Sequence, residues 1–362
     1  MKKDHSYYMD LAIRLSLKAK GKTLPNPMVG AVVVKNGRII ARGYHKKAGL
    51  PHAEIIALDE AGQAAKGAIL YLTLEPCVHF GRTPPCINKI IQSGIKEVVV
   101  GMIDPNPLTN GKGIQILKEH KIKVRVGILE NRIRKINEVF IKYITKKMPY
   151  ITVKVGQSLD GKIATRAGDS KWITSDASRN YAHKIRKNYD AIMVGVNTVL
   201  RDNPKLYALS SGGKIPKIIV DSQLSTSHVA NIFLNNSKVF IATIAERPGQ
   251  ETENRKILAQ KATILEIKEK EGQVNLRDMM KKLARLEIAN ILVEGGGTLI
   301  GSLFDEGLVD KVLFFISPKI IGGRDAISSV MGRGITHIDK AVKLKETKFK
   351  HIGEDLFIEA YV

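Results

Sequence analysis

The chain has 362 residues, of which 44% are hydrophobic, and a formal net charge of +23 at pH 7. This length predicts about two domains, and the hydrophobic content is sufficient for ordinary globular cores. No run approaches the ~20 apolar residues that span a membrane, and the N-terminus lacks the apolar region of a signal peptide. We therefore expect a cytoplasmic protein that does not enter a membrane.

The large positive charge first suggests a nucleic-acid-binding protein. The charge is spread along the chain, however, no RNA-binding signature is present, and only 6% of residues are aromatic and able to stack on bases. A small phosphorylated substrate or cofactor would also favour a positive field. A solvated basic surface without any partner explains the charge as well.

The first half of the chain predicts a layered α/β domain, because a hairpin is followed by alternating helices and strands. Asn36-Gly37 is typical of a hairpin turn and separates two apolar segments, residues 29–34 and 38–43. Further strands are expected at 69–74, 97–101 and 124–126. Helices are expected at 5–20, 52–65, 86–93 and 115–120, with a basic helical stretch at 132–147.

Both cysteines of the chain follow a histidine and a glutamate in the sequence. The order is His52-Ala53-Glu54, then Glu75-Pro76-Cys77, then Cys86. A His/Cys/Cys set can hold Zn²⁺ and leave a fourth position for water, whose pKa falls toward ~7. In zinc deaminases a glutamate that is not a ligand moves protons between this water and the leaving amine.

The spacing of the cysteines leaves alternatives open. Eight residues separate them, whereas zinc nucleobase deaminases usually have two. Unrelated buried thiols are an alternative, while a stable disulfide is less expected in a protein without a secretion signal. The predicted elements place Cys77 after a strand, and both His52 and Cys86 at helix starts, where parallel α/β folds usually hold ligands.

Three segments, residues 24–30, 43–54 and 75–86, together resemble the bifunctional deaminase/reductase family of riboflavin biosynthesis. The long separation of the cysteines is this family's own spacing. The resemblance implies a cytidine-deaminase-like fold in which His52, Cys77 and Cys86 bind Zn²⁺ and Glu54 is the proton shuttle.

The resemblance also implies that Asn26 and His45 hold the pyrimidine. Taken alone, Asn26 is equally well a turn residue between two prolines, and His45 a loop histidine. His79 is expected in a loop on the substrate side and not among the metal ligands. Residues 104–113 match the family except at Thr109-Asn110, and this loop is expected to border the substrate phosphate, although turn chemistry explains its prolines and glycines equally well.

The second half begins near Lys146-Lys147-Met148-Pro149, so we expect domains at 1–146 and 147–362. A glycine-rich turn, Glu294-Gly295-Gly296-Gly297, joins a predicted strand to a predicted helix and could bring backbone amides to a phosphate. Such glycines often only form turns, and this run is not the dinucleotide fingerprint. A helix is expected at 177–188, with strands at 150–155, 191–194, 217–220, 239–242, 291–293 and 312–316.

This half resembles the reductase half of the same family, which has a dihydrofolate-reductase-like fold. The matching segments are residues 158–162, 170–174 and 293–296. The resemblance implies NADPH as the hydride donor. The implied NADPH-binding residues are Gly156, Trp172, Thr198, Asp202, Ser222, Gly296, Gly297, Thr298, Leu299, Ile300, Gly301 and Ser302.

The resemblance further implies a substrate site lined by Ser170, Arg186, Leu206 and Glu294, with Lys154 facing the same cleft. Core packing is the simpler explanation for Trp172, and a surface charge is the simpler explanation for Arg186. The family usually has an arginine at the position of Leu209, where it would grip the substrate phosphate. Lys205, Lys214 or Arg186 could substitute for it, or the reductase could be weak.

The expected function is therefore deamination of 2,5-diamino-6-ribosylamino-4(3H)-pyrimidinone 5′-phosphate, followed by reduction of the ribosyl side chain to give 5-amino-6-ribitylamino-uracil 5′-phosphate. The expected partner is this small phosphorylated pyrimidine and not a nucleic acid or a membrane, and the enzyme is expected to be a homo-oligomer. Two alternatives are a deaminase with an impaired reductase domain and an RNA-editing deaminase.

Overall fold

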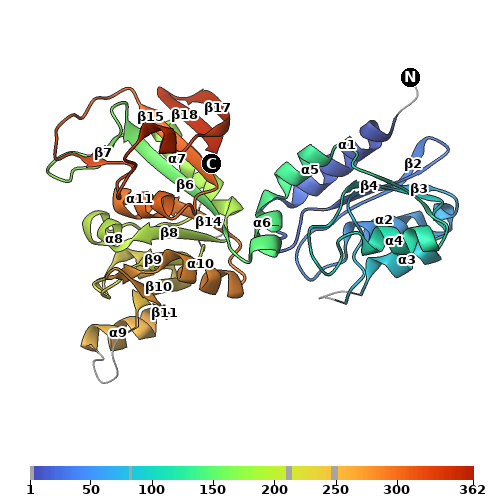
Figure 1. Ribbon diagram of the computed structural model, residues 1–362, viewed down its shortest axis with the longest axis horizontal. Helices are drawn as coiled ribbons and strands as arrows, with labels where there is room; N and C mark the ends of the chain where they lie inside the picture. The colour runs from blue at the N-terminus through green and yellow to red at the C-terminus, as the bar shows by residue number, and fades with distance from the viewer. Residues whose placement is uncertain (1–3, 81–83, 209–213, 246–251) are drawn as a thin grey trace. The chain divides into compact units, whose positions relative to one another are not determined.

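The computed structural model describes residues 4–80, 84–208, 214–245 and 252–362. Leu209 and residues 81–83 of the second cysteine segment therefore lie outside the described residues. The chain divides into two compact units, Met1–Met148 and Pro149–Val362, and this division falls just after the boundary that the sequence predicts. Figure 1 labels the helices and strands of each unit.

The first unit contains a five-stranded sheet with the order β2-β1-β3-β4-β5. β1 and β2 form the expected hairpin, and Asn36 and Gly37 both have the positive φ that its turn requires. β1 is antiparallel to β3, whereas β3, β4 and β5 run parallel. The strands are β1 (Gly30–Lys35), β2 (Arg38–Tyr44), β3 (Ile69–Leu74), β4 (Glu97–Met102) and β5 (Lys123–Val126).

Helices α1 and α2 pack against opposite faces of this sheet through two glycines. A Cβ at Gly30 would lie 1.9 Å from the carbonyl oxygen of Ala12 in α1, and one at Gly43 would lie 2.1 Å from that of Ala53 in α2. Gly43 pairs with Ala31, the residue after Gly30, and neighbouring residues of a strand point to opposite faces. The helices of this unit are α1 (His5–Ser16), η1 (Leu17–Ala19), α2 (Ala53–Ala61), η2 (Gly62–Ala65), α3 (Cys86–Gln92), α4 (Lys112–Glu119), α5 (Glu130–Ile136) and α6 (Glu138–Lys146).

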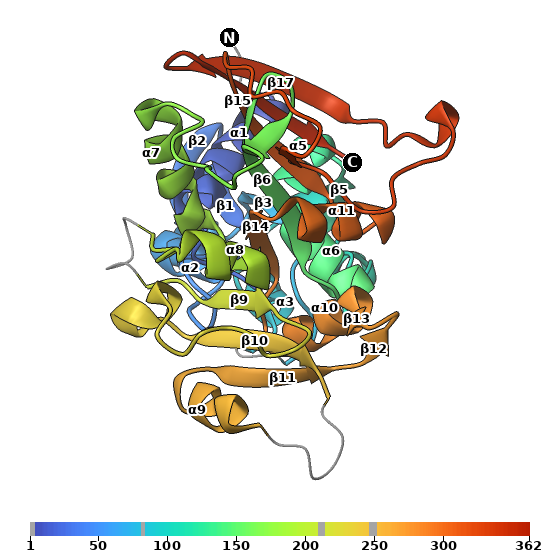
Figure 2. The same cartoon turned by 90° about the vertical axis from the view of Figure 1, so that its left-hand side faces the viewer.

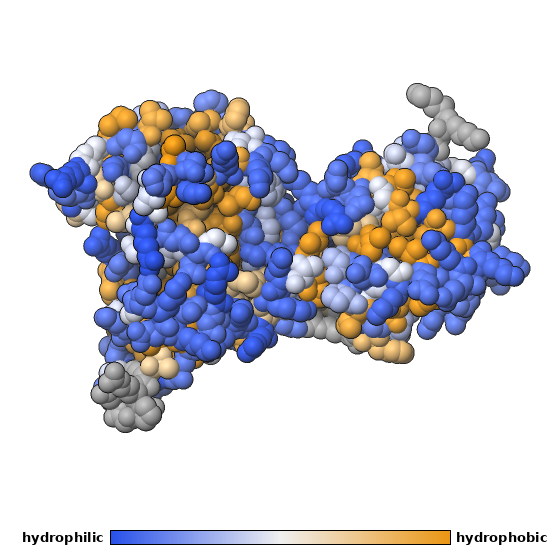
Figure 3. All heavy atoms as spheres, in the orientation of Figure 1, coloured by the Kyte–Doolittle hydropathy of each residue, from blue (hydrophilic) through white to orange (hydrophobic). Residues whose placement is uncertain are grey.

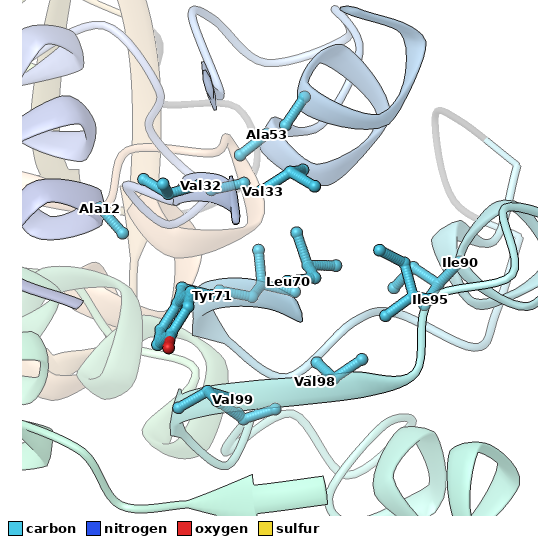
Figure 4. Packing of buried hydrophobic residues seen from close by; sticks show 14 of the residues in the cluster. Ala12, Val32, Val33, Ala53, Leu70, Tyr71, Ile90, Ile95, Val98 and Val99 are labelled. Carbon is cyan, nitrogen blue, oxygen red and sulfur yellow. The ribbon is translucent and has the colours of Figure 1, made fainter. Parts of the chain in front are cut away.

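Buried aliphatic side chains from the strands and helices form one core in this unit. Figure 4 shows Leu70, Val98 and Val99 of the central strands beside Val32 and Val33 of β1. Such a core fixes the positions of the strand ends, and therefore the positions from which the loops at those ends begin.

The basic helical stretch expected at 132–147 is present as two helices and not as one continuous helix. α5 ends at Ile136 and α6 begins at Glu138, with Asn137 at φ −109° and ψ 18° between them. The Asn137 side chain accepts a hydrogen bond from the Met28 N–H (2.8 Å) and donates one to the Met28 carbonyl (3.1 Å). This contact with a distant segment ties Asn137 to the loop before β1, and helical periodicity gives no sign of it.

The second unit contains a nine-stranded sheet with the order β11-β10-β9-β8-β14-β6-β15-β18-β17. The strands from β11 to β15 in this order are parallel, and β18 and β17 are antiparallel additions at one edge. Figure 2 shows β9, β10 and β11 side by side, with α9 beyond them. The strands are β6 (Tyr150–Ser158), β8 (Ala191–Gly195), β9 (Lys217–Val220), β10 (Val239–Ile244), β11 (Thr263–Ile267), β14 (Asn290–Glu294), β15 (Lys311–Ser317), β17 (Lys345–Ile352) and β18 (Asp355–Tyr361).

Helices and two small strand pairs complete this unit. The helix expected after the glycine-rich turn is present as α11, and the helix expected at 177–188 is α7 followed by a 3-10 turn. The helices are α7 (Asp176–Ile185), η3 (Arg186–Asn188), α8 (Val196–Asp202), η4 (Asn231–Asn236), α9 (Glu253–Lys261), α10 (Leu276–Arg285), α11 (Gly297–Asp305) and η5 (Ile338–Lys340), and the small pairs are β7 (Lys162–Ala164) with β16 (Ile327–Ser328) and β12 (Glu269–Lys270) with β13 (Gln273–Val274).

Hydrophilic residues cover much of the face shown in Figure 3, with smaller apolar areas among them. Among the residues that the structure describes, no helix combines the length and the apolar character that crossing a membrane would require.

Substitution of Gly43 by alanine tests the contact between β2 and α2. The added methyl group would meet the Ala53 carbonyl oxygen at 2.1 Å and the Ala57 nitrogen at 2.8 Å, so α2 must move. We expect the free energy of unfolding to fall by about 1–3 kcal/mol, as overpacking usually costs. Urea denaturation followed by circular dichroism measures this change.

Gly195→Ala is the matched control, because its added methyl group would make only an ordinary contact, 3.6 Å from Leu299 Cβ. Equal unfolding free energies for the two variants would show that the Gly43 contact does not constrain α2.

Candidate active sites

The structure brings His52, Cys77 and Cys86 together at the carboxyl end of β3. His52 is the residue before α2, Cys77 follows β3, and Cys86 begins α3. Their potential ligand atoms all lie within 4.8 Å of one another. His52 Nδ1 lies 3.1 Å from Cys86 Sγ and 3.7 Å from Cys77 Sγ. One imidazole and two sulfurs at these separations can converge on a single metal ion.

The chemistry of this donor set fits Zn²⁺. Both cysteines are free thiols, and soft sulfur with imidazole is a common zinc environment. The hydrogen bond between the two thiols lowers the pKa of Cys77 to about 4 and raises the pKa of Cys86. Cys77 therefore ionises readily, and a bound cation would favour the second thiolate.

Glu54 lies in the first turn of α2, beside this donor set, and is not part of it. Its side chain is buried, and its Oε2 atom has no hydrogen-bond partner among the described residues. Burial raises the pKa of Glu54. A buried carboxyl group with one unpartnered oxygen is suited to exchange a proton with a molecule in the site.

Asn26 and His45 also lie at this site, as the sequence predicts for the pyrimidine-binding residues. Asn26 Nδ2 is 3.2 Å from His45 Nε2, and the rings of His45 and His52 meet edge to face at 5.1 Å. His45 Nδ1 is 3.2 Å from the carbonyl oxygen of Pro51, which can only accept a hydrogen bond. His45 therefore donates through Nδ1 and accepts from Asn26 through Nε2. Burial lowers the pKa of His45, which favours this neutral form.

His79 is not among the three residues whose potential ligand atoms cluster, and its expected place on the substrate side stays a prediction. Its Nδ1 atom lies 3.3 Å from Thr109 Oγ1, so it contacts the segment at 104–113 that also matches the family. In this segment Asp104 is buried, and burial together with the nearby Glu75 and Cys77 raises its pKa to about 7.

The second unit holds a buried ion cluster at the end of β14. Arg186 donates to both oxygens of Glu294, through Nε and Nη2 at 2.7 Å each, and Lys154 Nζ lies 3.3 Å from Glu294 Oε2. Burial disfavours the Glu294 carboxylate, but Lys154 and Arg186 outweigh it and hold the pKa of Glu294 at about 2. The surface-charge explanation for Arg186 is therefore wrong.

Arg186 has a further partner in the segment that contains Leu206. Its Nη1 atom donates to the carbonyl oxygen of Tyr207 at 2.7 Å and lies 3.0 Å from His183 Nδ1. Lys154, Arg186 and Glu294, three of the residues predicted for the substrate site, thus form one ion cluster, and Leu206 directly precedes the Tyr207 carbonyl that Arg186 binds. Ser170 lies apart from this cluster and donates to Asp202 Oδ1 at 3.1 Å.

A pocket of about 620 Å³ opens beside the glycine-rich turn. Gly295 and Gly296 both have positive φ, which favours glycine, and lie against the Thr198 side chain. The pocket has room for a large ligand, and a helix N-terminus at its wall favours phosphate groups. The residues predicted for NADPH binding that line it are Thr198, Ser222, Gly296, Thr298, Leu299 and Ser302.

Other predicted NADPH-binding residues, all in α11, face away from this pocket. A Cβ at Gly297 would lie 2.2 Å from the Ser328 carbonyl oxygen, and one at Gly301 would lie 1.8 Å from the Met331 carbonyl oxygen. Ile300 is buried. One side of α11 therefore lines the pocket, while glycines on another side allow residues 328–332 to pack against its backbone.

The remaining predicted NADPH-binding residues lie on neighbouring elements outside the pocket lining. Gly156 is on β6, where a Cβ would lie 3.3 Å from the Thr174 side chain, and Asp202 ends α8. The Trp172 side chain is 65% exposed, with the Arg179 guanidinium 4.2 Å from its ring centroid. The core-packing explanation for Trp172 is therefore wrong.

Sequence reasoning missed several residues of both sites. The sequence analysis gave Glu75 no role beyond its place in Glu75-Pro76-Cys77. Its carboxylate accepts hydrogen bonds from residues 104–111, beside the loop of Cys77. Its position directly before Pro76 and Cys77, at the end of a buried strand, was the available signal. In the second unit the missed pocket residues include Asp221, Lys270, Arg277, Asp305, Glu306 and Arg333.

Two family models match the two units of this chain. The cytidine and deoxycytidylate deaminase zinc-binding region matches residues 2–102, and the RibD C-terminal domain matches residues 149–358. The deaminase match covers all three candidate metal ligands, His52, Cys77 and Cys86, and the second match covers the pocket and the ion cluster.

Curated relatives named riboflavin biosynthesis protein RibD match nearly the full chain. The protein of Aquifex aeolicus is 46% identical over 97% of this chain and 96% of its own length, and that of Escherichia coli is 36% identical over 97% of each. Among solved structures, Acinetobacter baumannii RibD has a TM-score of 0.87 at 33% identity over 99% of this chain and 98% of its own.

A Thermotoga maritima structure described as a diaminohydroxyphosphoribosylaminopyrimidine deaminase/5-amino-6-(5-phosphoribosylamino)uracil reductase has a TM-score of 0.84 at 36% identity, over 99% of this chain and 98% of its own. These matches do not favour an RNA-editing deaminase or an impaired reductase. The zinc-binding deaminase region and the reductase domain make Zn²⁺ and NADPH the cofactors of the chain. The chain belongs to the RibD family of riboflavin biosynthesis proteins, with a deaminase domain followed by a reductase domain.

Proposed function

We propose that the first unit hydrolyses an exocyclic amine of 2,5-diamino-6-ribosylamino-4(3H)-pyrimidinone 5′-phosphate and releases ammonia. The second unit then reduces the ribosyl side chain of the product to give 5-amino-6-ribitylamino-uracil 5′-phosphate. The observation that carries the proposal is the convergence of His52, Cys77 and Cys86 within 4.8 Å, beside the buried Glu54. The relatives' names supply the substrate class.

In the deaminase, His52, Cys77 and Cys86 hold Zn²⁺, which supplies an activated water when bound. Glu54 Oε2 is the atom that would take up a proton and pass it to the leaving amine. Burial keeps competing water away from the carboxyl group and, by raising its pKa, helps it to hold the proton between the two steps.

Asn26 and His45 orient the pyrimidine ring. Because His45 Nε2 accepts from Asn26 Nδ2, the Asn26 amide is held in one orientation. Its Oδ1 atom is then available to accept an N–H of the ring, which selects for a donor at that position of the substrate.

In the reductase, NADPH supplies a hydride to C1′ of the substrate when bound. The predicted cofactor residues on α8, on α11 and at the end of β9 hold it in and around the 620 Å³ pocket. Ser170, Arg186, Leu206 and Glu294 line the substrate site, and Lys154 presents its ammonium group to the same cleft. A side chain or water supplies the proton that accompanies the hydride.

The substrate phosphate of the reductase needs a cation other than Arg186. The family usually has an arginine at position 209, which is leucine here. The guanidinium of Arg186 is already engaged by Glu294 and by the Tyr207 carbonyl. We infer that the exposed Lys205 and Lys214 contribute the charge, and that reduction proceeds.

We also propose a cytoplasmic enzyme that forms homo-oligomers. The free thiols of Cys77 and Cys86 suit a reducing compartment. Light scattering of the purified chain, against its monomer mass of 40.0 kDa, would decide the oligomeric state.

Glu54→Gln is expected to abolish ammonia release while leaving the metal site loaded. The amide cannot take up and return a proton, and general acid–base groups contribute about 10²- to 10⁴-fold in rate. The measurement is ammonia release from the diamino-pyrimidinone phosphate, with zinc content by atomic absorption.

Glu60→Gln, on the same helix, is the matched control and should release ammonia at the native rate. NADPH oxidation with the deaminated intermediate supplied directly should persist in Glu54→Gln. Deamination above a tenth of the native rate in that variant would remove Glu54 from its assigned role.

NADPH binding is expected to quench the fluorescence of Trp172, the only tryptophan in the chain. Its ring is exposed, and reduced nicotinamide absorbs where indole emits. Titration of the protein with NADPH should give a saturable decrease, and Trp172→Phe supplies the background. Unchanged emission, when equilibrium dialysis shows bound NADPH, would place Trp172 away from the cofactor.

Lys205→Ala and Lys214→Ala are each expected to raise the KM of the reductase for the deaminated intermediate by about 5- to 30-fold, since a charge-assisted hydrogen bond contributes roughly 1–2 kcal/mol. The KM for NADPH should not change. Steady-state NADPH oxidation measures both constants. Lys256→Ala, on the exposed surface of α9, is the control, and an equal effect there would indicate a general loss of positive field.

A further inference from the structure

The carboxylate of Glu75 is saturated by backbone amides from one distant segment. Its Oε2 atom accepts from the N–H groups of Asp104 (3.1 Å) and Gly111 (2.9 Å). Its Oε1 atom accepts from those of Gly113 (2.9 Å) and Ile114 (3.2 Å). Glu75 is buried, and in the described part of the chain no cation is paired with it. All four of these hydrogen bonds therefore come from one stretch of backbone, residues 104–114.

Strand pairing explains why these amides come within reach. β3 and β4 are parallel, with Leu74 opposite Met102, and the Glu75 N–H donates to the Met102 carbonyl at 3.0 Å. The loops that follow these two strands therefore leave the same edge of the sheet, where parallel sheets form their ligand-binding crevices. One of these loops carries Cys77, and the other is residues 104–114.

Close packing and a second polar contact join the same two loops. A Cβ at Gly113 would lie 2.5 Å from the carbonyl oxygen of Pro76, so the backbones touch there. Farther along, Thr109 Oγ1 meets His79 Nδ1 at 3.3 Å. Residues 104–114 therefore form a wall against the loop that begins with Cys77, and Glu75 supplies the largest group of contacts that hold it.

We propose that Glu75 is a positioning residue of the deaminase, whose carboxylate holds residues 104–114 as the wall of the substrate site beside Cys77. The proposal rests on the deaminase function proposed above. Among the residues that the structure describes, no hydrogen bond or ion pair joins the Glu75 carboxylate to His52, Cys77, Cys86 or Glu54. Its loss should therefore disturb substrate binding more than the chemical step. Substrate would then meet a displaced wall in an otherwise intact metal site.

Glu75→Gln is the sharpest test, because it keeps the shape of the side chain and replaces one acceptor oxygen with a donor. The new N–H₂ group would face two backbone N–H groups, which must move away. We expect the KM of deamination to rise about 10- to 100-fold, the scale on which small misplacements reduce catalysis. We expect kcat to change less than threefold and zinc to remain at one ion per chain.

Glu97→Gln is the matched control in the same sheet. Glu97 is also a buried carboxylate, but it lies at the start of β4, away from the Cys77 edge, and is paired with Arg125 at 2.6 Å. It should leave the KM of deamination unchanged. Reductase activity on the deaminated intermediate reports an intact second unit in both variants.

Hydrogen exchange gives a readout that does not depend on deamination. In Glu75→Gln the amides of Gly111, Gly113 and Ile114 should exchange faster, and in Glu97→Gln they should not. If the native chain releases no ammonia, the proposed function fails. The exchange pattern still tests whether the Glu75 carboxylate holds residues 104–114 in place.

Three results would overturn the proposal. One is a KM of Glu75→Gln within twofold of the native value. A second is a loss of deaminase activity that added zinc restores, which would assign Glu75 to the metal site. If Glu75→Gln does not fold, Gly111→Ala decides, because it strains a residue at φ +86° and leaves Glu75 in place. A raised KM there supports the proposal, and an unchanged KM is the third result against it.

Discussion

Parallel strand pairing is the constraint on which both sites depend. In the first unit the register of β3 against β4 brings the loop of Cys77 beside residues 104–114. In the second unit Glu294 and Lys154 are direct partners in the register of β14 against β6, so their side chains meet in an ion pair. Because parallel strands all end at the same edge, polar residues placed just after a strand are gathered there without a dedicated scaffold.

The cost of this arrangement is that charged groups must be buried at the strand ends. A buried charge is tolerated when hydrogen bonds or an opposite charge replace water. The two units use different solutions, since Glu294 has two cations and Glu75 has backbone amides. Lys154 and Arg186 hold a side chain, Glu294, in place, whereas the amides that bind Glu75 hold a segment of main chain.

Short-range patterns were sufficient to predict the hairpin at Asn36-Gly37 and the layered α/β class. The metal-ligand set depended on the family resemblance, because the spacing of the cysteines alone left alternatives open. Long-range contacts were not predictable: Asn137 breaks a helical stretch because it binds Met28, and periodicity within 132–147 cannot show this. β17 was missed because it is an exposed edge strand rich in lysine. α10 has a clear amphipathic pattern and could have been found, whereas α9 is mostly polar and buries Leu258.

Neither the glycine-rich run nor the net charge shows by itself which individual residues bind a ligand. Gly296 lines the pocket, while Gly301 is required by the backbone packed against the other side of the same helix, so one motif serves binding and packing together. Cations at the pocket, such as Arg277 and Lys270, are paired with Glu306. The positive charge of these two side chains is therefore neutralised locally, and the proposed phosphate binding there would depend on backbone amides and local geometry more than on the overall field.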